Sequence, residues 1–237
     1  MTSTPDTVPA LLASALGADP GRPLVTYYDH ATGERIELSV ATTANWVSKT
    51  ANMLQDSLAA DGSTTVSLRL PTHWEDVVWH LACWSVGCRV VGPDADADLV
   101  VVGPEVLTGD VPVADEVVAL SLRPLGGRFV EPLPAGVVDY NAEVLGHGDV
   151  FSAHAPPRPA DHAPLLERGR ALGLDPGDRL LVTGADDPVD ALLAVLVVGG
   201  SLVLLVDSSG AAVDDARVDA VAATERVSRR PGGPASR

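Results

Sequence analysis

The sequence is poor in basic side chains, and this limits the partners that it can serve. Lys49 is its only lysine, and 16 lysine and arginine residues stand against 32 acidic ones, for a formal net charge of −16. Binding to nucleic acid or to an anionic membrane depends on basic residues that neutralise phosphates. We therefore expect an acidic, soluble, cytoplasmic protein with no nucleic-acid partner and no membrane partner.

Cysteine and long apolar runs are also scarce. Cys83 and Cys88 lie five residues apart, a spacing that suits neither a redox pair nor a zinc site. The longest apolar stretch, residues 191–206, is interrupted by two glycines and a serine and is too short to span a bilayer. Residues 1–16 lack the charged and apolar regions of a secretory signal. These absences again indicate a reduced, cytoplasmic protein.

Recognisable catalytic motifs are missing. The sequence has no Gly-x-Ser-x-Gly motif, and Gly199-Gly200 precedes a strand, whereas a dinucleotide site needs its glycines between strand and helix. One group of metal-ligand residue types lies in the proline-rich middle of the chain: His147, Asp149, His154, Asp161 and His162. The histidine spacings of seven and eight residues match no ligand pattern, so we expect a solvated linker with no metal ligands and no catalytic residues.

Apolar residues form regular patterns that predict an α/β fold. They make up 46% of the 237 residues, which argues against disorder and allows a sizeable core. Their spacing predicts helices at residues 7–16, 40–58, 74–86, 164–172, 187–198 and 213–224. It predicts strands at residues 23–28, 34–38, 64–70, 89–91, 99–102, 117–122, 137–140, 179–183 and 201–206. Strands that alternate with helices are typical of a parallel sheet with helices packed on it.

We expect these elements to form two subdomains. The first spans residues 1–150 and includes an N-terminal β-hairpin, a proline-rich linker spans 151–162, the second spans 163–228, and the tail 229–237 is disordered. A strand–turn–helix–glycine–strand order occurs in both. Five positions correspond at a constant offset: Leu68 with Leu181, Leu81 with Ala194, Gly87 with Gly200, Val90 with Val203, and Asp94 with Asp207. The pattern indicates either a genuine repeat or two ordinary βαβ units.

Several segments carry a family pattern. They are Arg22-Pro-Leu-Val-Thr-Tyr-Tyr-Asp29 with the Thr-Gly hairpin after it, Val66-Ser-Leu-Arg-Leu-Pro71, the helix end Val86-Gly87, the turn Gly92-Pro-Asp94, residues 171–179, and Gly199-Gly-Ser-Leu-Val-Leu204. Together they resemble AMP-binding enzymes, the adenylate-forming, acyl-CoA synthetase-like family, over about two-thirds of the chain. They also resemble a small group of single-copy proteins of high-GC Gram-positive bacteria with this shorter form. The resemblance implies two similar, packed α/β subdomains with mainly parallel sheets and flanking helices.

The chain departs from this family where the family's chemistry resides. The resemblance places the phosphate-binding loop at residues 151–159, which are proline-rich and therefore offer few N–H donors to an anion. The adenine-binding segment, the ribose-binding aspartate and the mobile C-terminal domain with its adenylation lysine have no counterpart, and Lys49 matches no such position. We therefore expect a pseudoenzyme that does not perform adenylation on its own.

Two loops that follow strands remain as weak candidates for ligand binding. Their residues are Thr183, Gly184, Asp186, Asp187, Asp207, Ser208, Ser209 and Gly210. The second loop precedes a helix and can present N–H groups to a small anion, although we favour an ordinary turn and helix cap.

Three functions are compatible with the sequence, in decreasing order. The first is a non-catalytic binding or protein-interaction module that forms a homodimer or joins a protein partner. The second is a protein that binds a nucleotide (ATP or AMP) or an acyl-adenylate in a vestigial cleft between the subdomains. The third is an enzyme with new chemistry at residues 147–162.

Overall fold

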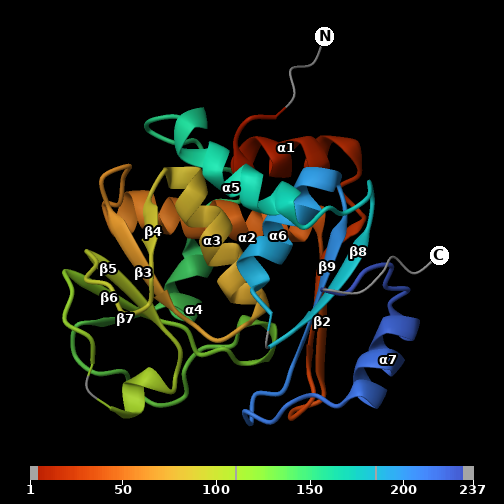
Figure 1. Ribbon diagram of the computed structural model, residues 1–237. Helices are drawn as coiled ribbons and strands as arrows, with labels where there is room; N and C mark the ends of the chain where they lie inside the picture. The colour runs from red at the N-terminus through yellow and green to blue at the C-terminus, as the bar shows by residue number, and fades with distance from the viewer. Residues whose placement is uncertain (1–4, 110, 185, 232–237) are drawn as a thin grey trace. The chain divides into compact units, whose positions relative to one another are not determined.

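The computed structural model describes residues 5–109, 111–184 and 186–231 (Figure 1). The chain divides into two compact units: unit 1 comprises Met1–Ala44 with Arg158–Arg237, and unit 2 comprises Asn45–Pro157. Each unit has a sheet with helices packed on it, so the α/β class with mainly parallel sheets is confirmed. None of the helices in the described segments is long and apolar enough to cross a membrane.

Unit 1 is built around a four-stranded sheet in the order β2-β1-β9-β8. Its elements are α1 (Val8–Ala18), β1 (Pro23–Asp29), β2 (Glu34–Ser39), α5 (Pro159–Ala171), β8 (Arg179–Thr183), α6 (Pro188–Val198), β9 (Ser201–Val206) and α7 (Asp215–Thr224). Strand β1 pairs antiparallel with β2 and parallel with β9, which pairs parallel with β8. Helix α6 packs on one face of the sheet with α1 and α5 beside it, whereas α7 covers the other face (Figure 1).

The central strand of this sheet explains its apolar sequence. All six residues of β9 are buried, as expected for a parallel strand that is covered on both faces. On the α7 face, Tyr28, Val203 and Leu205 form an apolar cluster with Val221 and Ala222 of the helix. The short helix α7 is therefore attached to the sheet partly by burial of its own apolar side.

A buried carboxylate provides the polar part of this attachment. Glu225 follows α7 directly, and its Oε1 accepts hydrogen bonds from Tyr28 Oη (2.5 Å) and from Arg35 Nε and Nη2 (3.1 and 2.9 Å). Its Oε2 accepts from Arg179 Nη2 (2.5 Å), which also donates to Thr26 Oγ1 (2.9 Å). Burial alone would raise the pKa of Glu225, but these hydrogen bonds outweigh burial and lower it. One carboxylate thus joins β1, β2 and β8 to α7.

Unit 2 is built around a five-stranded sheet in the order β4-β3-β5-β6-β7, with every strand pair parallel. Its elements are α2 (Val40–Asn52), which begins in unit 1, the π-helical turn η1 (Met53–Ser57), β3 (Thr65–Arg69), α3 (Trp74–Val86), β4 (Arg89–Val91), β5 (Leu99–Val102), β6 (Glu116–Ala119), β7 (Val137–Asp139) and α4 (Tyr140–Glu143), with 3₁₀ turns η2 (Val106–Thr108), η3 (Pro124–Gly126) and η4 (Val144–Gly146). All 13 residues of α3 are buried. Two aromatic pairs pack within the unit, Trp46 with Trp74 and Trp79 with Tyr140, at ring-centroid distances of 5.3 and 5.2 Å.

The unit boundaries differ from those expected from the sequence. The sequence predicts that the β-hairpin belongs to a subdomain of residues 1–150, but β1 pairs with β9, so the hairpin completes a sheet whose other strands come from the second half of the chain. The expected linker, residues 151–162, ends early because α5 begins at Pro159, and proline is tolerated in the first turn of a helix. The pairing of β1 with β2 follows from the short turn between them. The pairing of β1 with β9 joins segments far apart in the sequence, so the local pattern does not predict it.

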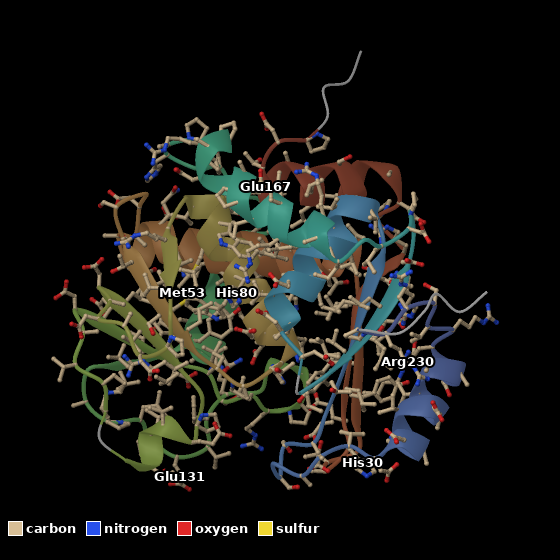
Figure 2. The ribbon with its side chains drawn as sticks, viewed as in Figure 1. His30, Met53, His80, Glu131, Glu167 and Arg230 are labelled. Carbon is tan, nitrogen blue, oxygen red and sulfur yellow. The ribbon has the colours of Figure 1, made fainter. Side chains whose placement is uncertain are left out.

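The start of the expected disordered tail, residues 229–237, belongs to the fold. Arg229 forms a β-bridge with Leu180, and Arg230 Nη1 forms an ion pair with Asp219 Oδ1 of α7 at 2.8 Å (Figure 2). The edge strand β8 thus receives backbone partners from the tail. Residues 232–237 lie outside the described residues.

Both βαβ units that suggest an internal repeat are present. Strands β3 and β4 are parallel neighbours, as are β8 and β9. Their registers differ, because Val90 lies opposite Val66, whereas the constant offset and the pairing of Leu181 with Val203 would place it opposite Leu68. The two units therefore share a topology without sharing a register.

We predict that Glu225→Gln destabilises the protein by about 2 kcal/mol at pH 7, because it leaves Arg179 without its buried charged partner. The lowered pKa of Glu225 means that its contribution is present above the unfolded value near 4.5 and is lost as the pH falls through the folded pKa. Urea unfolding at pH 7 and pH 4 measures both effects. Glu37→Gln, at a more exposed carboxylate of the same network, should cost less than about 1 kcal/mol. Equal effects of the two substitutions would contradict the assignment.

Candidate functional site

The candidate residues lie in two loops at the carboxyl edge of the unit 1 sheet. Thr183 ends β8 and lies opposite Leu205, near the end of β9. Loops 183–187 and 207–210 therefore leave the same edge, beside the end of β1, where Figure 2 shows His30. This edge of a parallel sheet is where ligands of α/β proteins usually bind. The structure thus brings the two loops together, and it does so within one unit.

The first loop is held by its own aspartates. Asp186 Oδ2 accepts hydrogen bonds from Thr183 N (2.7 Å) and Thr183 Oγ1 (3.0 Å). Asp187 caps the N-terminus of α6, where its Oδ1 accepts from the backbone N–H of Val189 (2.8 Å) and of Asp190 (3.2 Å). A side chain at Gly184 would have ordinary van der Waals space, so this glycine marks no close approach of the backbone. The next residue, Ala185, lies outside the described residues.

The second loop is a tight turn tied to the end of β1. Asp207 Oδ1 accepts from Ser209 N (3.0 Å) and from Ser209 Oγ, and Gly210 N donates to Asp207 O (3.0 Å). Gly210 has φ +82°, a backbone conformation that glycine adopts without strain. Ser208 donates twice to Asp29, from N to Oδ1 (3.0 Å) and from Oγ to Oδ2 (2.7 Å).

Asp29 is the residue that sequence reasoning missed at this edge. It is 4% exposed, and it also accepts hydrogen bonds from Ala31 N (3.0 Å) and Thr32 Oγ1 (2.8 Å). Burial alone would raise the pKa of Asp29, but the hydrogen bonds from Ser208 and Thr32 outweigh burial and lower it. The local sequence signals only a turn, because the tie to Ser208 joins residues 179 positions apart.

The polar groups of this edge are therefore largely engaged with one another. The N–H groups of Ser208 and Ser209, which could face an anion, already bind carboxylates. The surrounding aspartates would also repel a negatively charged ligand. This geometry is that of turns and helix caps, and ligand binding by the eight candidate residues stays a prediction.

Helix α2 and the turn η1 hold residues 147–152, which lead into the proline-rich segment 151–159 that the resemblance aligns with the phosphate loop. Three side chains spaced three residues apart donate to its backbone oxygens: Lys49 to His147 (2.6 Å), Asn52 to Gly148 (2.9 Å) and Val150 (3.0 Å), and Gln55 to Ser152 (3.2 Å). Lys49 also forms an ion pair with Asp149 Oδ1 at 2.7 Å. The only lysine of the chain thus has a structural role.

The histidines expected to lie in a solvated linker have separate roles. His162 belongs to α5 and is 3% exposed, and its Nδ1 accepts a hydrogen bond from Val8 N at the start of α1 (3.3 Å). His154 instead uses its backbone N–H to bind Gln55 Oε1 (2.9 Å). Within the described segments, no group of three or more histidine, cysteine, aspartate or glutamate side chains is placed to share a metal ion.

Comparison with known proteins gives the chain its family. No family model matches it. A protein of Mycobacterium tuberculosis (strain ATCC 25618 / H37Rv), described as a TIGR03089 family protein, is 38% identical over 246 residues, which cover 96% of this chain and 99% of that protein. The chain belongs to the TIGR03089 family.

Solved structures show which larger proteins share the fold of this TIGR03089 family chain. The acyl-CoA synthetase of Brucella canis matches with a TM-score of 0.71 at 18% identity, over 94% of this chain and 46% of that one. The anthranilate CoA ligase AuaEII, in complex with anthranoyl-AMP, matches at 0.70 and 15%, over 94% and 49%. A fatty acyl CoA synthetase of Mycobacterium tuberculosis matches at 0.69 and 11%, over 95% and 49%. The chain therefore has the fold of the N-terminal part of adenylate-forming enzymes and spans about half of their length.

We predict that Asp29→Ala destabilises the protein by about 2 kcal/mol and loosens the second loop, because it removes an acceptor of four hydrogen bonds at a buried position. Chemical unfolding measures the free energy, and proteolysis near residues 207–210 measures the loop. Asp207→Ala is the matched control, because its side chain binds only within the exposed turn and should cost about 0.5 kcal/mol. If Asp207→Ala lowers the free energy of unfolding more than Asp29→Ala does, the hydrogen bonds between Asp29 and Ser208 do not stabilise the loop.

We predict that His162 makes the stability of unit 1 depend on pH. Burial lowers the pKa of His162, and the nearby carboxylates of Asp161 and Asp6 oppose this effect. The neutral ring is the form that accepts from Val8 N, so its contribution is complete above the unfolded pKa near 6.5 and is lost as the pH falls. The free energy of unfolding of the wild type should decline relative to His162→Gln between pH 8 and pH 5. Parallel pH profiles would contradict this role.

Proposed function

We propose that this protein is a non-catalytic member of the adenylate-forming fold that works as a protein-interaction module, with a second copy of the chain as its first partner. The observation that carries the proposal is the distribution of exposed apolar side chains. Among the described residues, five large apolar side chains of unit 2 are exposed: Val113 (101%), Leu125 (80%), Val130 (73%), Leu145 (53%) and Val150 (85%). A contiguous patch of exposed apolar side chains is a common mark of protein contact surfaces, and five exposed side chains in one unit favour such a patch.

Two of these side chains lie on loops that cover one face of the unit 2 sheet. Val100, Val102, Val117 and Ala119 form the apolar layer of that face. Side chains from the two loops pack on this layer: Val111 and Ala114 from the loop before β6, and Phe129 and Leu133 from the loop before β7. Val113 and Val130 belong to the same loops but are exposed. Each loop therefore packs on the sheet through its partly buried side chains while its exposed valine faces solvent.

The non-catalytic part of the proposal rests on groups that are already engaged. Gln55 of η1 binds the backbone of Ser152 and His154 in the segment aligned with the phosphate loop, and Lys49 is paired with Asp149. The aspartates and serines at the carboxyl edge of unit 1 bind one another. Catalysis of adenylation requires free donors that follow the developing charge on phosphate.

A second candidate function is the binding of a nucleotide or an acyl-adenylate at the carboxyl edge of the unit 1 sheet. The grouping of Thr183, Asp187 and Ser208 at one edge favours it. So does the shared fold with a ligase whose structure contains anthranoyl-AMP. Against it stands the engagement of the N–H groups at this edge.

We predict that the purified chain has the mass of a dimer in light scattering, independent of added nucleotide. The double substitution Val113→Glu with Val130→Glu should shift the mass to that of a monomer and change the free energy of unfolding of each chain by less than about 0.5 kcal/mol per site, because both side chains are exposed. Leu16→Glu, at an exposed apolar residue of unit 1, is the control and should leave the dimer intact.

A thermal-unfolding series with ATP, AMP, coenzyme A and an acyl-sulfamoyl adenylate separates the two functions. A ligand at 100 times its dissociation constant adds about 2.7 kcal/mol, which raises Tm by several degrees in a protein of this size. The interaction module predicts no rise in Tm that depends on the loops at the carboxyl edge of unit 1. A wild type that is monomeric at all concentrations, or a rise in Tm with an adenylate that Ser208→Ala abolishes, would contradict it.

A further inference from the structure

A cavity of about 570 Å³ lies at the opposite edge of the unit 1 sheet, where the strands begin. Its lining includes Arg179 and Ser201, the first residues of β8 and β9, together with Arg22, which precedes β1. Glu225 and Arg226, just beyond α7, complete the side formed by that helix. The volume is that of a site for a small metabolite rather than for a single water molecule.

The acidic groups around this cavity are neutralised within the protein. Glu225 binds both Arg35 and Arg179. Glu37 pairs with Arg35 at 2.9 Å and lies 3.8 Å from Arg179. Each carboxylate is therefore matched by a guanidinium group, and neither is left to attract a cation.

Two further arginines of the lining have no such match. Arg22 Nη1 donates to Gly200 O (2.6 Å), which leaves most of its five N–H donors unused. Arg226 is exposed, and its guanidinium group forms no hydrogen bond or ion pair with the described residues. The nearest acidic influence on Arg22 is Asp19, whose carboxylate binds Gly21 N rather than the guanidinium group. In a chain of net charge −16, two unmatched arginines at one cavity stand out.

The backbone of Arg226 supplies an independent observation. Arg226 has φ +52°, the left-handed conformation that follows many helix ends. At the same place after α3 and α6 the chain uses Gly87 and Gly199, which adopt this conformation without strain. An arginine there costs stability, and such strain is commonly retained where the side chain has a use.

The negative ends of the helix dipoles do not explain why both Arg22 and Arg226 line the cavity. Gly199 and Thr224 line the cavity, so α6 and α7 end beside it and present the negative ends of their dipoles. The guanidinium group of Arg22 interacts with the negative end of the α6 dipole, because its Nη1 donates a hydrogen bond to Gly200 O. Only the backbone N–H of Arg226 binds a helix carbonyl, that of Ala223, so the charge of its guanidinium group remains available to a ligand.

We propose that this cavity binds a small doubly charged oxyanion, a phosphate group or a dicarboxylate, through the guanidinium groups of Arg22 and Arg226. Two arginines match two negative charges, and the planar guanidinium binds either type of oxyanion with paired hydrogen bonds. Ser201 Oγ, which accepts from Arg179 Nη1 (3.0 Å), retains its own proton for the ligand. This site is independent of the proposed interaction surface, which lies in unit 2.

The variant Arg226→Gly tests the proposal because its effects on stability and on binding have opposite signs. Without ligand it should raise Tm by about 2–4 °C, because glycine relieves the left-handed backbone. With inorganic phosphate or malonate, at an ionic strength held constant with potassium chloride, the wild type should gain in Tm. Titration calorimetry should show a dissociation constant at least about tenfold higher for Arg226→Gly than for the wild type.

Two further variants make the result specific. Arg22→Gln should weaken the response to the same anion as Arg226→Gly does. Arg158→Gln removes an equal charge from the exposed residue that precedes α5, outside the cavity, and should keep the wild-type response. A response to phosphate alone or to malonate alone identifies the ligand group. The proposal is overturned if neither anion stabilises the wild type beyond potassium chloride, or if Arg226→Gly and Arg158→Gln respond equally.

Discussion

The carboxylate of Glu225, buried among Tyr28, Arg35 and Arg179, is the constraint on which unit 1 depends. It joins α7 to three of the four strands of the sheet. A carboxylate at this depth is stable only because charged and hydroxyl donors surround it. The same arrangement sets the charge of the neighbouring cavity, since it uses Arg35 and Arg179 for neutralisation and leaves Arg22 and Arg226 unmatched.

The two edges of the unit 1 sheet consequently differ in chemistry. At the carboxyl edge, Asp29, Asp186 and Asp207 accept hydrogen bonds from the very groups that an anion would need. At the amino edge, basic groups face a cavity. The fold shared with adenylate-forming enzymes places a ligand site at the carboxyl edge in principle, but in this chain the free charge lies at the other end of the strands.

The sequence predicted the elements better than their assembly. The helix Trp74–Val86 and the strands Arg89–Val91, Leu99–Val102, Arg179–Thr183 and Ser201–Val206 have the expected bounds, because apolar periodicity and glycine stops are local signals. The unit boundaries were not predicted, because the pairing of β1 with β9 joins distant segments. Of the candidate site, the grouping of the two loops followed from strand order, whereas Asp29 did not. Residues such as Arg22 and Arg226 are separated by most of the chain and carry no shared pattern.

The central claim concerns the two edges of the unit 1 sheet. At the carboxyl edge the polar groups are engaged with one another, whereas at the amino edge the guanidinium groups of Arg22 and Arg226 can bind a ligand. Amide hydrogen exchange with and without inorganic phosphate or AMP tests it most directly, because it locates a ligand without presuming its site. The account predicts slowed exchange at residues 199–201 and 224–227 with phosphate, and unchanged exchange at residues 183–187 and 207–210 with either ligand. Protection confined to residues 183–187 and 207–210 would contradict it and return the binding function to the carboxyl edge.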